Sequence, residues 1–146
     1  MQITLATIGK LKDPSLKSIY DEYKKRLEWK IEGHEFPNKA SPQQESSLLL
    51  NSLPSSSYVI VLDEKGDNLK SEEFADLLKT IQIHHQGKVS FVIGGANGLS
   101  DDIKSCSQRS LSFGRMTWPH LLVRIMLMEQ LYRAQQILKG HPYHRD

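Results

Sequence analysis

The sequence predicts an α/β fold in which a mostly parallel sheet carries helices on both of its faces. Short apolar runs typical of buried strands recur along the chain, and stretches with helical periodicity separate one run from the next. No internal repeat or low-complexity tract interrupts this alternation. The length of 146 residues suits one domain, so we expect residues 1–146 to form a single unit.

The first strand and helix are predicted near the amino end. Residues 2–8 are β-branched and apolar and stop at Gly9, which is typical of a strand. Asp13-Pro14 then marks a helix start, because an aspartate oxygen can cap the first turn and a proline needs no N–H there. The predicted buried face of this helix consists of Leu16, Tyr20, Tyr23 and Leu27.

A second strand and helix follow with weaker signals. Residues 31–36 fit a strand, and Ser41-Pro42 repeats the helix-start signal. The apolar stripe of this helix consists of Leu49, Leu50 and Leu53.

The middle of the chain contains two strongly apolar strands. The continuous run at residues 58–62 predicts a strand covered on both faces, and we expect residues 63–66 to turn the chain after it. Ser71 is placed to cap the next helix, and residues 89–93 fit another buried strand.

The last third holds two helices and a short strand. Ser100 and the two acids after it predict a helix start, since the helix dipole favours negative charge in the first turn. Residues 110–113 fit a strand, and residues 120–139 fit a long helix that Gly140 ends.

Composition narrows the classes of function. The net charge of +2 is too balanced to indicate nucleic-acid binding by itself. Cys106 is the single cysteine, so no internal disulfide is possible and we expect a reducing, cytoplasmic setting. We expect no signal peptide and no membrane span. The six histidines show no metal-ligand spacing, so we expect no bound metal.

Ligands of such sheets bind beyond the carboxyl ends of the strands. Three predicted strand ends carry suitable residues, at 62–64, 94–98 and 113–118. The glycines of residues 94–98 would let the backbone approach a ligand, although a tight strand-to-helix turn explains them equally well. Their spacing is neither that of a dinucleotide-binding loop nor that of a P-loop. The segment after the first strand, Gly9-Lys10-Leu11-Lys12, also lacks the dinucleotide pattern.

Several charged residues near the carboxyl end are candidates for binding or catalysis. Arg124 lies among apolar residues of the last helix, where an arginine usually has a buried partner or binds an anion. Glu129 and Arg133 form an i,i+4 pair in helical register. The segment Tyr143-His144-Arg145 offers an aromatic ring for stacking, an imidazole that can titrate and a guanidinium that can bind phosphate. The alternative interpretation of this segment is a frayed chain end.

These motifs together resemble a known family. The chain is similar over its whole length, and most specifically after residue 91, to the RlmH (YbeA-like) family of SPOUT methyltransferases. The matching motifs are Ile93-Gly94-Gly95-x-x-Gly98-Leu99-Ser100, Met116-Thr117-x-Pro119-His120-x-Leu122-x-Arg124, Glu129-Gln130-Leu131-Tyr132-Arg133-Ala134 and Gly140-His141-Pro142-Tyr143-His144. The resemblance implies a SPOUT-type fold with a C-terminal trefoil knot, and a homodimer without a separate RNA-binding domain.

The resemblance also implies an activity. It is S-adenosyl-L-methionine-dependent methylation of N3 of a pseudouridine in 23S ribosomal RNA, in the intersubunit stem-loop of the assembled ribosome. The implied active-site segment is Tyr143, His144 and Arg145, with His144 in proton removal or substrate orientation and with Arg145 and Arg124 on phosphates or bases. The implied cofactor contacts are Leu62, Gly94, Phe113, Gly114, Arg115, Met116, Thr117 and Trp118, of which Arg115 falls where the family varies.

Other interpretations stay open at this point. They are a SPOUT methylase with another RNA target, an inert RNA- or nucleotide-binding module of the same fold, and a structural α/β dimer. The predicted helix at residues 120–139 is apolar around much of its circumference, so part of it should pack on a second copy. In such a dimer the segment 143–145 could reach the cofactor pocket of the other subunit, whereas an inert module would have no use for it.

Overall fold

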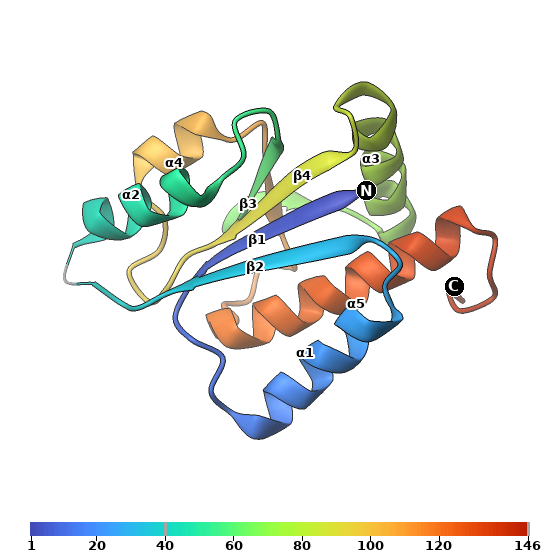
Figure 1. Cartoon of the computed structure of the whole chain (residues 1–146), viewed down its shortest axis with the longest axis horizontal. Coiled ribbons are helices and arrows are strands. Elements are labelled where there is room, and N and C mark those ends of the chain that lie inside the picture. The colour runs from blue at the N-terminus through green and yellow to red at the C-terminus, as the bar shows by residue number, and fades with distance from the viewer. Residues whose placement is uncertain (40, 146) are drawn as a thin grey trace.

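A computed structural model describes residues 1–39 and 41–145, and within them the chain forms a five-stranded sheet with the order β2-β1-β4-β3-β5 (Figure 1). Each pair of neighbouring strands in this sheet runs parallel. The strands are β1 (Gln2–Ile8), β2 (Lys30–Phe36), β3 (Tyr58–Asn68), β4 (Lys88–Ile93) and β5 (Arg109–Ser112). The predicted parallel α/β sheet is thus confirmed.

Helices cover both faces of the sheet, as the alternation of apolar side chains along the strands requires. On one face α1 (Pro14–Arg26), α3 (Ser71–His84) and α5 (His120–Leu138) pack on side chains such as Leu5 and Phe91. On the other face α2 (Pro42–Ser52) and α4 (Asp101–Cys106) pack on the alternate side chains. Figure 1 shows α5 lying beside α1 under the sheet, with α2 and α4 above it.

The predicted capping residues are confirmed for α1 and α2, whereas α3 forms as predicted but is not capped by Ser71. Asp13 caps α1 through backbone N–H groups of its first turn, and the Ser41 hydroxyl accepts from the Gln44 N–H at 3.1 Å. At α3 the cap is Lys70, whose N–H donates to the Glu73 carboxylate at 2.7 Å. The Ser71 hydroxyl instead donates to the Gln130 side chain on α5 at 2.8 Å. It therefore makes a tertiary hydrogen bond and does not cap its own helix.

The turn predicted at residues 63–66 is wrong, because β3 continues to Asn68. Leu111 of β5 pairs with both Leu62 and Asp67, so the residues between them form a bulge in this ladder. Gly66 passes so close to β5 that an added Cβ would lie 2.6 Å from the Leu111 carbonyl carbon. A glycine allows the two backbones to approach here, and the bulge contains Asp63 and Glu64.

The last helix ends as predicted at a glycine in the left-handed conformation. Gly140 has a φ of 70°, and its N–H donates to the Ile137 carbonyl at 3.0 Å. The His141 N–H donates to the Gln136 carbonyl at 3.0 Å, which completes a Schellman motif. This motif reverses the chain, so the terminal segment folds back along α5 (Figure 1). Among the helices in residues 1–39 and 41–145, none has the length and hydropathy that a membrane span needs.

Candidate functional site

A cavity of about 600 Å³ lies at the carboxyl ends of β4, β3 and β5. This is the edge of a parallel sheet at which ligands bind. Of the eight residues expected to contact a cofactor, Arg115 is exposed and does not line the cavity. The other seven, which come from β3 and from the loops after β4 and β5, do line it: Leu62, Gly94, Phe113, Gly114, Met116, Thr117 and Trp118.

The loop after β4 forms one wall of the cavity, and glycine is needed at its positions for different reasons. An added Cβ at Gly94 would lie 2.8 Å from the Gly98 carbonyl oxygen, and one at Gly95 would lie 2.9 Å from the Asn38 side-chain oxygen. Gly98 has a φ of 70°, and its N–H donates to the Gly95 carbonyl at 3.0 Å. Gly94 is thus required by close packing and Gly98 by backbone conformation, and the loop is both a tight turn and a cavity wall.

The loop after β5 forms the opposite wall. Gly114 has a φ of 117°, and its N–H donates to the Ser112 hydroxyl at 3.2 Å. That hydroxyl donates in turn to the Gly114 carbonyl at 2.6 Å, which fixes the turn. Beyond it, the Met116 and Trp118 side chains are 75% and 43% exposed, so the mouth of the cavity presents a thioether and an indole to solvent.

Charged side chains line the rim, and the sequence alone did not group them. Lys104 on α4 pairs with Asp63 at 2.7 Å. Burial opposes ionisation of Asp63, but hydrogen bonds from Lys104 and from the Lys65 N–H outweigh it and lower the pKa of this carboxyl. The Glu64 carboxylate accepts from the Thr117 hydroxyl at 3.1 Å, which joins the β3 bulge to the β5 loop. Nothing in the local sequence around Lys104 could have indicated its partner, because the pairing depends on the fold.

His120 begins α5 and lies between the cavity and the loop after β1. It lines the cavity, and an added Cβ at Gly9 would lie 3.0 Å from its Nε2. Burial, with the nearby Arg124 charge, lowers the pKa of His120 despite an opposing effect of Glu45. The imidazole is therefore neutral at pH 7, in keeping with a packing role.

Arg124 does not lie where RNA could contact it. Its guanidinium is 2% exposed; one nitrogen donates to the Glu35 carboxylate at 2.6 Å and another to the Gly9 carbonyl at 2.9 Å. Burial lowers the pKa of Arg124, and Glu35 opposes that shift. The sequence predicted a buried partner or an anion; the partner found is a carboxylate, although the Glu35 side chain is itself 43% exposed. The phosphate or base contact expected from the resemblance does not fit this placement.

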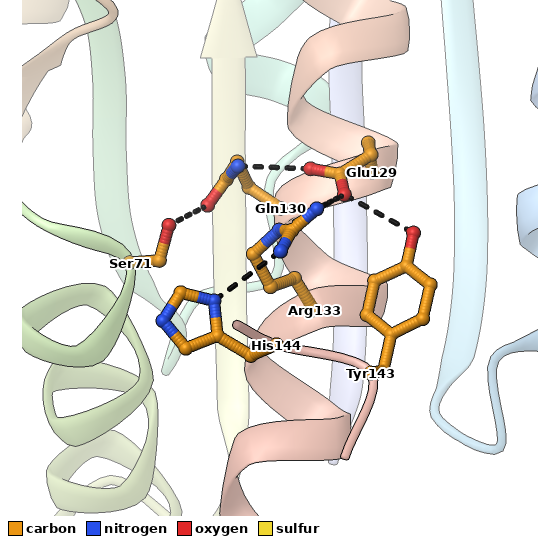
Figure 2. Close-up of polar contacts among 6 residues, drawn as sticks. All are labelled: Ser71, Glu129, Gln130, Arg133, Tyr143 and His144. Carbon is orange, nitrogen blue, oxygen red and sulfur yellow. Dashed lines mark hydrogen bonds and ion pairs between the residues drawn. The ribbon is translucent and has the colours of Figure 1, made fainter. Parts of the chain in front are cut away.

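Glu129 organises a polar cluster around the terminal segment (Figure 2). Its carboxylate accepts from Arg133 at 2.6 and 3.0 Å, from the Gln130 amide at 2.8 Å and from the Tyr143 hydroxyl at 3.2 Å. The Tyr143 ring packs edge-on against Tyr132 with 4.8 Å between the ring centroids. The terminal segment is consequently docked on α5, and the alternative of a frayed tail is wrong for residues 143 and 144.

His144 is held between two helices. Its Nδ1 lies 3.2 Å from the Arg133 guanidinium of α5, and its Nε2 lies 2.8 Å from the Glu72 carboxylate of α3. A guanidinium can only donate, so Nδ1 must accept and the proton of the neutral ring sits on Nε2, facing Glu72. With both nitrogens engaged, His144 serves here as an anchor of the tail.

The tail and the cavity adjoin different stretches of α5. His120 at the start of the helix lines the cavity, whereas Glu129 and Arg133, further along it, contact the tail. At the usual rise per residue these two contacts lie about 14 and 20 Å along the helix from His120. None of Tyr143, His144 and Arg145 lines the cavity. Across residues 1–39 and 41–145, no cluster of three or more His, Cys, Asp or Glu residues is arranged to hold a metal ion.

Comparison with known proteins identifies the family of this chain. Residues 1–144 match a family model described as "Predicted SPOUT methyltransferase". The protein of Rhodospirillum centenum named ribosomal RNA large subunit methyltransferase H is 41% identical over 151 residues, which cover 99% of this chain and 99% of that protein.

Solved structures show the same fold at low sequence identity. A probable methylase family protein from Haemophilus influenzae Rd KW20 has a TM-score of 0.60 and 13% identity, over 99% of this chain and 70% of that one. The SpoU methyltransferase AviRb from Streptomyces viridochromogenes, solved in complex with AdoMet, has a TM-score of 0.50 and 10% identity, over 94% of this chain and 61% of that one. The full-length family match, the 41% identity and the shared fold establish that this chain belongs to the SPOUT methyltransferase family.

Proposed function

We propose that the protein is an S-adenosyl-L-methionine-dependent methyltransferase of large-subunit ribosomal RNA. The observation that carries this proposal is the 41% identity, over 99% of both chains, to a protein named ribosomal RNA large subunit methyltransferase H. The cavity at the carboxyl edge of the sheet supports it, because separate loops converge there around a space suited to a small molecule.

The residues around the cavity fit S-adenosyl-L-methionine. Its volume of about 600 Å³ lies in the usual range for small-molecule sites. Leu62, Leu111 and Trp118 offer apolar surface for an adenine ring, and the glycine-bearing loops offer backbone donors and acceptors. The Asp63 and Glu64 carboxylates on the β3 bulge add acceptors for hydroxyl or ammonium groups. AviRb, which shares the fold, was solved with the same cofactor.

The finer proposal concerns the target. From the resemblance in sequence motifs, we propose N3 of a pseudouridine in the intersubunit stem-loop of 23S ribosomal RNA, modified on the assembled ribosome in the cytoplasm. The cofactor would supply a sulfonium-bound methyl group for in-line displacement: the N3 electron pair forms the new N–C bond, the C–S bond electrons return to sulfur, and the N3 proton leaves. The protein's residues must then position the base and favour loss of that proton.

We propose that Arg145 favours loss of the N3 proton and that Tyr143 and His144 hold Arg145 in position. Burial, together with the nearby Glu129 charge, raises the pKa of Tyr143 to about 12, so its hydroxyl remains protonated at neutral pH and serves as a donor. His144 has both ring nitrogens engaged by Arg133 and Glu72. Arg145 is exposed next to these anchors, and a guanidinium beside N3 would stabilise the deprotonated base. The proton then passes to solvent.

A homodimer would bring this segment to a cavity. If α5 packs antiparallel on α5 of a second copy, the end of one helix lies beside the start of the other. Exposed apolar side chains at the start of the helix, Trp118 and Leu122, favour burial there. We propose that each active site combines the cavity of one subunit with the terminal segment of its partner.

Methyl transfer from labelled S-adenosyl-L-methionine to ribosomes tests the proposal. Wild-type protein should methylate assembled ribosomes faster than isolated large subunits or free RNA, and mass spectrometry of the digested RNA should place the label on N3 of a pseudouridine. Label on another nucleotide would support a SPOUT methylase with a different target. Cofactor binding without transfer to any of the three substrates would support the inert binding module.

A further inference from the structure

The segment Gly9-Lys10-Leu11-Lys12 lies at the same edge of the sheet as the cavity. It follows β1, which pairs with β4, and β4 leads into the glycine loop of the cavity wall. Gly9 adopts a φ of 89° and packs on the His120 imidazole, which itself lines the cavity. The Gly9 N–H also donates to the Phe36 carbonyl at 2.6 Å. The start of this loop is thereby fixed against the cavity wall.

An ion pair between the buried Arg124 and the exposed Glu35 holds the rest of the loop through its backbone. Arg124 donates to the Gly9 carbonyl at 2.9 Å and to the Glu35 carboxylate at 2.6 Å. The same Glu35 oxygen accepts from the Leu11 N–H at 2.6 Å. Burying a guanidinium costs free energy, and it is retained only with close partners. Here those partners fix Gly9 and Leu11, so the pair acts as a brace for the loop.

The brace leaves two positive charges facing solvent. Leu11 is buried, whereas Lys10 and Lys12 on either side of it are exposed. Between the described residues no ion pair involves either lysine. Glu35, whose carboxylate accepts from the Leu11 N–H, pairs with Arg124, and the neighbouring Asp13 caps α1. The loop therefore presents two lysine ammonium groups in a fixed place.

We propose that Lys10 and Lys12 bind phosphates of the RNA strand that flanks the target nucleotide, with Arg124 and Glu35 as positioning residues. This inference rests on the proposed RNA substrate. Phosphate contacts fix the register of a nucleic acid without reading its sequence, and ammonium groups on a rigid loop suit that role. The charge needed for RNA binding is then concentrated beside the cavity, although the net charge of the whole chain is only +2.

The direct test is a double substitution, Lys10→Ala with Lys12→Ala. Its control is Lys30→Ala with Lys79→Ala, which removes two exposed lysines far from the loop, one at the amino end of β2 and one in the second half of α3. Affinity for ribosomes and for a fluorescein-labelled RNA stem-loop is measured over a series of salt concentrations. The loop variant should bind about tenfold more weakly at low salt, and its salt slope should fall by about 0.7–0.9 per lost phosphate contact.

The control variant and a Lys10→Arg, Lys12→Arg variant should keep the wild-type affinity and slope. Equal affinities and slopes for the loop variant and the control would overturn the inference. This outcome is distinct from failure of the proposed function, which would appear as no methyl transfer by the wild-type protein. Calorimetry with S-adenosyl-L-methionine should give the same affinity for all of these variants, which shows that the cavity is intact.

The brace is tested with the lysines in place. Arg124→Lys keeps one charge but cannot reach the Gly9 carbonyl and the Glu35 carboxylate together. It should increase the rate of tryptic cleavage after Lys10 and Lys12 and should weaken RNA binding. An Arg124→Lys variant that is cleaved faster yet binds RNA with wild-type affinity and salt slope would contradict the positioning role.

Discussion

At the scale of single residues, the protonation state of Tyr143 decides whether its hydroxyl can act as a hydrogen-bond donor or as a base. Its pKa is raised from the ordinary 10.0 to about 12, first by burial and then by the Glu129 charge. The folded state therefore holds this proton more tightly than the unfolded state does. The resulting stabilisation is fully present below about pH 10 and is lost as the pH rises toward 12.

Tyr143→Phe tests this directly. The variant keeps the ring against Tyr132 but loses the hydrogen bond to Glu129, so we expect a free energy of unfolding lower by about 1 kcal/mol at neutral pH. The difference from wild type should shrink between pH 10 and 12, as wild type loses the stabilisation that the variant never had. Thermal unfolding across this pH range measures it, and a constant difference would contradict the assignment.

Gly94 gives a second prediction at this scale. An added Cβ would lie 2.8 Å from the Gly98 carbonyl, so Gly94→Ala must displace the loop that walls the cavity. We expect a loss of S-adenosyl-L-methionine affinity of at least about tenfold, measured by calorimetry. The matched control is Gly33→Ala on β2, where an added Cβ meets the Tyr20 hydroxyl at an ordinary 3.5 Å. Equal affinities for the two variants would remove the loop from the cofactor site.

At the scale of elements, the sequence predicted what local chemistry decides. Strand and helix positions follow from periodicity, and the α1, α2 and α5 ends follow from Asp13, Ser41 and Gly140. The errors arose where a distant residue decides the outcome. Ser71 bonds Gln130, which is 59 positions away, and Arg124 pairs with Glu35, which is 89 positions away.

The residues of the candidate site also fall into those that local sequence could predict and those that depend on distant partners. The strand-end rule and the family motifs predicted seven residues that line the cavity, since the carboxyl ends of parallel strands necessarily share an edge. They could not predict the Lys104–Asp63 pair or the anchoring of His144 by Glu72, because both join separate elements. The trefoil knot, inferred from the resemblance, stays a prediction.

The terminal segment supplies a prediction about one element. Deleting residues 143–146 removes the anchors on Glu129, Arg133 and Glu72 but leaves every residue that lines the cavity in place. We expect cofactor affinity within about twofold of wild type and no detectable methyl transfer in a single-turnover assay. Wild-type turnover by the truncated protein would exclude the tail from the reaction.

At the scale of the whole molecule, the proposed composite site requires a dimer, because no residue of the tail lines the cavity of its own chain. Sedimentation at micromolar concentration should give a dimer, and a stable monomer would contradict the composite site. A sharper test mixes two inactive chains. One carries Gly94→Val and the other lacks residues 143–146, so a hybrid dimer has one cavity and one tail that belong to the same active site. Mixing should restore methyl transfer, whereas either chain alone should stay inactive.

The span of sequence that lines the cavity has a consequence for synthesis. Lining residues run from Leu62 through Val123, whereas two strands of the sheet, β1 and β2, come before residue 62 in the chain. A nascent chain can hold strand-like structure long before it holds a place for the cofactor. Ligand binding stabilises only the state that binds. If the cavity binds the proposed cofactor, products of interrupted translation that stop before Val123 gain no such stabilisation, whereas the complete chain is stabilised with the logarithm of the cofactor concentration.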